Sequence, residues 1–76
     1  MPRRYRPEEV VKVLESLGWA VVRQRGSHVI LSKEGIRAIS VVPLSRREVA
    51  PGTFGSILRQ AELSPREFEQ RANEVL

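Results

Sequence analysis

The sequence predicts an α+β fold in which helices cover one face of a three-stranded antiparallel sheet. The prediction rests on an amphipathic helix pattern near the start, three β-rich segments joined by short turns, and two further helix patterns after them. So few elements enclose only one hydrophobic core, and we therefore expect residues 1–76 to form a single domain.

The first helix is predicted over residues 7–17. Pro7 suits the first helical position, and the two glutamates that follow it suit the positive end of the helix dipole. Apolar residues at positions 10, 13, 14 and 17 follow the spacing of one helix face. Gly18 is typical of the residue that follows a helix.

Residues 19–24, 28–33 and 36–42 are rich in β-formers and are predicted to be strands. Arg25-Gly26 and Glu34-Gly35 separate them as tight turns, and Pro43 ends the third strand. Because such short connections join only antiparallel neighbours, the three strands are predicted to form a meander.

A polar connection, residues 44–50, leads to a second helix that is predicted to start near Pro51. Its apolar face is expected to consist of Phe54, Ile57, Leu58 and Ala61. Residues 64–67 match a capping box and predict a third helix, with Phe68, Ala72 and Val75 facing inward. The order α-β-β-β-α, with an added C-terminal helix, matches the topology of the double-stranded-RNA-binding domain.

The charge is positive and unevenly distributed. The net charge is +4 and the isoelectric point is about 10.7. Residues 1–60 hold eleven Arg and Lys against five Glu, whereas residues 61–76 hold two Arg against four Glu. Such a surface predicts an anionic partner, RNA above all. The alternative is an arginine-rich surface that is simply solvated.

The chain has no cysteine and one histidine. A metal site would need carboxylates for every other ligand, so we expect neither a metal nor another cofactor. No apolar run approaches the ~20 residues that span a bilayer, and the basic N-terminus lacks the apolar stretch of a signal peptide. We therefore expect a cytoplasmic protein without a membrane partner.

Four motifs occur in order along the chain: VLESLGW at 13–19, RGSH at 25–28, VVP at 41–43 and PGTFGSILRQA at 51–61. Together they resemble the HicA, or YcfA-like, family of mRNA interferase toxins, over roughly residues 6–63. The resemblance implies the toxin of a toxin–antitoxin system, an endoribonuclease acting on mRNA without metal. It also implies His28 as the catalytic residue and a HicB-type antitoxin that covers the catalytic face. Many members carry a second histidine where this chain has Ser45.

Metal-free cleavage of RNA needs a base for the ribose 2′-hydroxyl, an acid for the leaving oxygen and positive charge near the phosphate. Histidine suits proton transfer because its unperturbed pKa is about 6.5. Since His28 is the only histidine, it fills one role, which we assign first to the general base. The other role is left to water, Lys33 or Ser27, and we expect a slow enzyme.

The residues predicted to bind RNA lie near His28 in the sequence or follow the third strand. Arginine pairs with phosphate oxygens bidentately, lysine supplies a point charge, and glycine lets a phosphate approach the backbone. The predicted set is Arg23, Arg25, Gly26, Ser27, Lys33, Arg46 and Arg47. Turn formation or a solvated strand face is the structural alternative for each. Tyr5 and Trp19 are candidates for base stacking, although Trp19 suits the core better.

Two other functions fit the same sequence. A non-catalytic RNA-binding module would have the same topology and charge, and only Gly26-Ser27-His28 argues against it. A degenerate toxin that binds only its antitoxin would explain the absent second histidine. Direct DNA binding is not expected, because no helix-turn-helix pattern is present.

Overall fold

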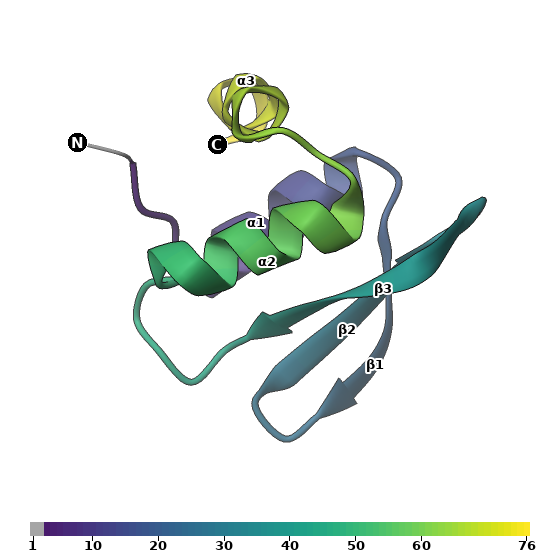
Figure 1. The fold of residues 1–76 in the computed structure, drawn as a ribbon. Helices are drawn as coiled ribbons and strands as arrows, with labels where there is room; N and C mark the ends of the chain where they lie inside the picture. The colour runs from purple at the N-terminus through teal and green to yellow at the C-terminus, as the bar shows by residue number, and fades with distance from the viewer. Residues whose placement is uncertain (1–2) are drawn as a thin grey trace.

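The computed structural model describes residues 3–76. The elements follow the order α1 (Pro7–Ser16), β1 (Ala20–Arg25), β2 (His28–Lys33), β3 (Ile36–Pro43), α2 (Pro51–Ala61) and α3 (Pro65–Val75) (Figure 1). The strands form one antiparallel sheet with β2 in the centre. The predicted α+β class and element order are confirmed, and each observed boundary lies close to its predicted position.

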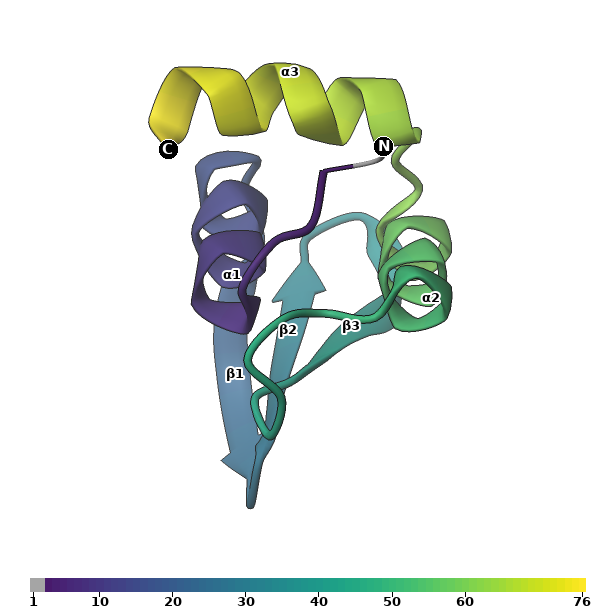
Figure 2. The ribbon, with the colours of Figure 1, turned by 90° about the vertical axis from the view of Figure 1, so that its left-hand side faces the viewer.

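Helices α1 and α2 cover the same face of the sheet, and α3 crosses above them on the side away from the strands (Figure 2). The apolar faces of α1 and α2 are buried as predicted, with Val10 and Leu14 on α1 and Ile57 and Leu58 on α2. Burying such a side chain contributes about 1.5–3 kcal/mol. The shared core of helices and sheet therefore stabilises the fold without any disulfide.

An aromatic cluster joins the start of the chain to the two last helices. The ring centroids of Tyr5 and Phe54 lie 5.5 Å apart, and both rings lie 5.0 Å from Phe68. Tyr5 is only 3% exposed, as is Trp19, and burial raises the pKa of the Tyr5 hydroxyl. The expectation that Trp19 belongs to the core is therefore confirmed, whereas Tyr5, named as a candidate for base stacking, is also buried in the core.

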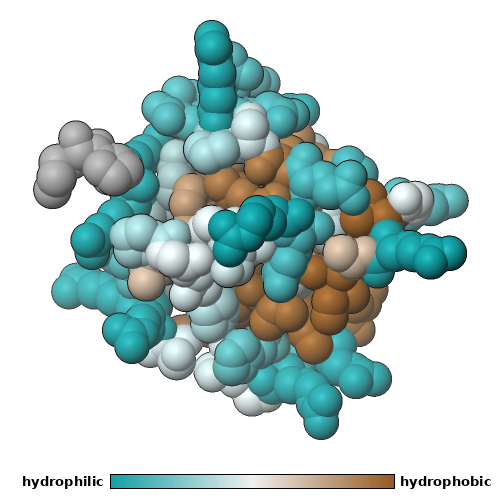
Figure 3. All heavy atoms as spheres, viewed as in Figure 1, coloured by the Kyte–Doolittle hydropathy of each residue, from teal (hydrophilic) through white to brown (hydrophobic). Residues whose placement is uncertain are grey.

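The sheet has an irregular edge strand and several exposed apolar side chains. The pairing of β1 with β2 shifts register between Val21 and Arg23, which marks a β-bulge. Val21, Val22 and Ile39 are 43%, 59% and 46% exposed. Figure 3 shows apolar atoms gathered over the strands beside α2, with hydrophilic side chains around them. An apolar area of this kind on a small domain is typical of a surface that meets a partner.

Within residues 3–76, none of the helices combines the length and the apolar character needed to cross a lipid bilayer.

Candidate active site

The backbone of His28 is paired with both neighbouring strands of the sheet. It is the first residue of β2 and pairs with Arg25 on β1 and Pro43 on β3. The β1–β2 turn consists of Gly26, with φ 56°, and Ser27. This left-handed conformation favours glycine, so Gly26 has the turn role that the sequence allowed.

The side chain of His28 lies on the sheet face opposite to the buried residues of β2. Val29 and Leu31 of β2 are buried beneath the helices, and side chains alternate between the faces of a strand. His28 and Ile30 therefore point to the open face of the sheet. Arg25 and Arg23 stand opposite these two residues in the register and share that face. The structure thus brings both arginines onto the His28 side of the sheet.

His28 borders a surface depression with a volume of about 370 Å³. The depression lies between the ends of β2 and β3, the connection that follows β3, and the first turn of α2. It is lined by His28, Val41, Pro43, Ser45, Arg46, Glu48, Val49, Ala50 and Thr53. We call it the His28 depression. Ser45, which stands where many HicA members have a second histidine, therefore lies in the same depression as His28.

The connection over residues 44–50 is anchored on both sides of its polar residues. The backbone N–H of Leu44 donates to the Ser27 carbonyl, and that of Val49 donates to the Tyr5 carbonyl at 2.8 Å. Val49 is also buried in the core, at 4% exposure. Residues 45–48 between these anchors are exposed. The fold therefore holds a short polar segment against the depression.

The first turn of α2 borders the same depression through Ala50 and Thr53. Ala50 is the N-cap residue and Pro51 follows it, and no side chain of residues 3–76 caps this end. The positive end of the helix dipole therefore stays available to an anion.

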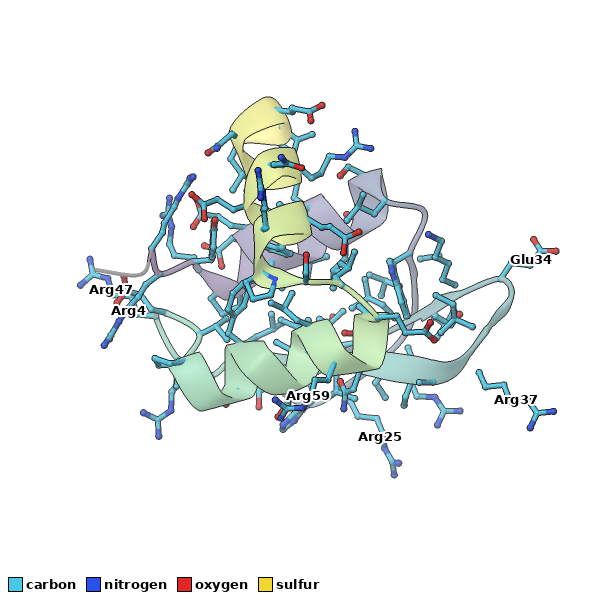
Figure 4. The ribbon with its side chains drawn as sticks, turned by 45° about the horizontal axis from the view of Figure 1, so that its top comes forward. Arg4, Arg25, Glu34, Arg37, Arg47 and Arg59 are labelled. Atoms are coloured by element: carbon cyan, nitrogen blue, oxygen red, sulfur yellow. The ribbon has the colours of Figure 1, made fainter. Side chains whose placement is uncertain are left out.

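The two arginines that were predicted to bind RNA after β3 lie in different surface depressions. Arg46 lines the His28 depression, whereas Arg47 lines a second depression with Arg4 and Arg6. Figure 4 shows Arg4 and Arg47 next to each other, and Arg25 extending away from the ribbon. The two arginines of the connection over residues 44–50 therefore lie in different depressions, and its positive charge is divided between two parts of the surface.

Lys33 lies at the opposite end of β2 from His28. It ends β2, and five residues at about 3.3 Å each place it roughly 17 Å from His28. Its stem runs close to Gly18, where an added Cβ would come within 3.2 Å of Lys33 Cε. Because the strand is extended, Lys33 lies too far from His28 to assist its proton transfer, and its role in RNA binding stays a prediction.

Glu48 lines the His28 depression and was not singled out from the sequence. It lies in a connection without regular structure, where no periodicity predicts the direction of a side chain. Its one sequence signal is that it is the only carboxylate between Gly35 and α2.

The comparison with known families agrees with this geometry. A family model described as the HicA toxin of bacterial toxin–antitoxin matches residues 7–63, well over half of the chain. None of the curated proteins matches it. The match includes the whole sheet, α1 and α2, and every residue that lines the His28 depression. The chain therefore belongs to the HicA toxin family of bacterial toxin–antitoxin systems.

Proposed function

We propose that this HicA toxin is an endoribonuclease that cleaves mRNA without a metal and uses His28 for proton transfer. The proposal rests on the position of His28. His28, the chain's only histidine, is exposed at the edge of a depression that also contains Arg46 and borders the open end of α2. A phosphate placed there meets positive charge and a group suited to proton transfer at neutral pH.

Arg25 and Arg46 would hold the phosphate at the cleavage site. Arg25 stands opposite His28 in the sheet, and Arg46 lines the depression. Ser27 and Gly26 precede His28 in the turn and would let the RNA backbone approach. Arg23 and Arg47 would extend the contact with the RNA backbone on either side of the cleavage site. Because these contacts reach phosphates rather than base edges, we expect weak sequence preference and strong salt dependence.

The family implies an antitoxin partner, and we propose a HicB-type antitoxin that covers the His28 face. Arg23 and Arg25 would meet acidic groups of that antitoxin, and the exposed apolar side chains Val22 and Ile39 would meet its apolar ones. Such a complex would block RNA by occupying the surface that binds it. We place both partners in the cytoplasm, where mRNA is available.

The test is to incubate the purified chain with labelled mRNA in excess EDTA. Wild type should cut the RNA, and His28→Ala should bind it on a gel without cutting. If wild type only shifts the RNA, the non-catalytic binding module replaces our proposal. If the wild-type chain binds the antitoxin but neither binds nor cuts RNA, the protein is a degenerate toxin. Equal cutting by His28→Ala would show that another residue is responsible.

A further inference from the structure

The proposed reaction includes two proton transfers, and His28 supplies one group for them. Attack by the 2′-hydroxyl needs a proton acceptor, and departure of the 5′-oxygen is faster with a proton donor. Of the side chains that line the His28 depression, Glu48 is the only carboxylate. We propose that Glu48 accepts the proton of the 2′-hydroxyl while His28 donates one to the leaving 5′-oxygen. This inference rests on the proposed ribonuclease function.

The position of Glu48 is fixed by its neighbour. Val49 is buried, and its backbone N–H donates to the Tyr5 carbonyl at 2.8 Å. Tyr5 is itself held between Phe54 and Phe68. The backbone of Glu48 is thus attached to the core while its side chain remains exposed at the depression. A carboxylate that is held by its backbone and open to solvent suits proton exchange with substrate and water.

Several cationic side chains lie around Glu48. Arg46 shares the His28 depression with it, and Arg4, Arg6, Arg47 and Glu9 share the second depression that it lines. Arg6 lies 3.8 Å from the Glu9 carboxylate, whereas Glu48 forms no ion pair within the described part of the chain. Among the described residues, no ion pair therefore holds Glu48 away from a bound substrate.

The two roles follow from the chemistry of the two side chains. An ionised carboxylate only accepts protons, whereas an imidazolium ring donates from its nitrogens. With the Glu48 carboxylate in the same depression, His28 therefore takes the acid role, whereas the sequence alone suggested the base.

The 2′-hydroxyl gives its proton to the Glu48 carboxylate as its oxygen forms a bond to phosphorus. The bond between phosphorus and the 5′-oxygen breaks, and that oxygen takes the proton of the His28 imidazolium. The products are a 2′,3′-cyclic phosphate and a free 5′-hydroxyl. Proton exchange with water restores Glu48 and His28. No oxidant, reductant or metal takes part.

The test compares wild type with Glu48→Gln, Glu48→Asp and Glu34→Gln over a pH series from about 4 to about 8. Glu34 is the matched control because it extends into solvent at the opposite turn of the sheet (Figure 4). Glu48→Gln should lower kcat about 10²–10⁴-fold and remove the acidic limb of the pH profile. Glu48→Asp should retain that limb with lower activity, and Glu34→Gln should match wild type.

Each other outcome overturns the inference in a recognisable way. Glu48→Gln with wild-type rate and profile would exclude Glu48 while leaving His28 as the site. A slower Glu48→Gln that keeps the acidic limb would show a structural role, which thermal unfolding would detect. A wild type that leaves RNA intact would instead overturn the proposed function, and with it this step.

Discussion

The Gln60 side chain on α2 accepts a hydrogen bond from the backbone N–H of Val41 on β3, with 3.2 Å between Oε1 and N. β3 is an edge strand, so this N–H has no neighbouring strand to pair with. Val41 also lines the His28 depression. This hydrogen bond therefore ties α2 to one wall of the candidate site.

Replacing Gln60 with Ala should lower the free energy of unfolding by about 0.5–1.5 kcal/mol, because the Val41 N–H loses its acceptor. Urea denaturation measures the loss. Gln60→Glu keeps an acceptor oxygen and serves as the control. Equal stability of wild type and Gln60→Ala would show that water replaces the amide without cost.

The capping box of α3 should make stability depend on pH. The backbone N–H of Ser64 donates to Glu67 Oε1 at 3.0 Å, and this bond, with the Ser64 side chain, lowers the pKa of Glu67 from its usual 4.5. A folded-state pKa below the unfolded one contributes stability above pH 4.5, which is lost as the pH falls through the folded value. Glu67→Gln should remove this contribution.

The measurement is thermal unfolding of wild type and Glu67→Gln at neutral and acidic pH. The difference between them should be larger at neutral pH and shrink in acid. Ser64→Ala should cost about 1 kcal/mol through loss of the cap. A constant difference at all pH values would contradict the proposed titration.

Ser40 of β3 is fully buried, and its hydroxyl has no hydrogen-bond partner among the described residues. Replacing it with Ala removes an unsatisfied polar group and should leave the protein equally stable or slightly more stable. Leu31, its cross-strand partner, is the control, because Leu31→Ala should cost about 2–5 kcal/mol. A marked loss in Ser40→Ala by chemical denaturation would reveal a bound water at the hydroxyl.

Arg25 and Lys33 should differ in their effect on RNA binding, since only Arg25 pairs with His28. Arg25→Gln should weaken binding and reduce the salt slope by about one phosphate contact. Lys33→Gln removes the same charge at the far end of β2 and should change affinity much less. Filter binding at several salt concentrations measures both, and equal effects would show that only net charge matters.

Ser45→His should increase the cleavage rate, because it places a second imidazole in the His28 depression. The gain should disappear in the double variant with His28→Ala, since the new group would assist the reaction rather than replace His28. Single-turnover cleavage measures the rate. Equal rates for Ser45→His and wild type would show that Ser45 points away from the bound phosphate.

Local signals were sufficient to predict the elements of this fold. Pro7, Pro51 and Pro65 mark the three helix starts, and Gly26 and Gly35 mark the turns where φ is positive. The bulge after Val21 and the cluster around Tyr5 could not be predicted, because they depend on contacts between distant segments.

The candidate site was predicted only in part. His28, Gly26 and Ser27 follow from a contiguous motif, and their position at a strand start is confirmed; their roles remain predictions. Lys33 was misplaced because nearness in sequence is not nearness along an extended strand. Glu48 was missed because its direction depends on the anchoring of Val49 by Tyr5.

The last helix has a practical consequence. The family match ends at residue 63, yet Phe68 and Ala72 beyond it are fully buried. The end of sequence similarity is thus not the end of the folding unit. A chain ended at residue 63 would expose the rings of Tyr5 and Phe54, which pack against Phe68, to water and would tend to aggregate. Shortened variants should therefore keep α3.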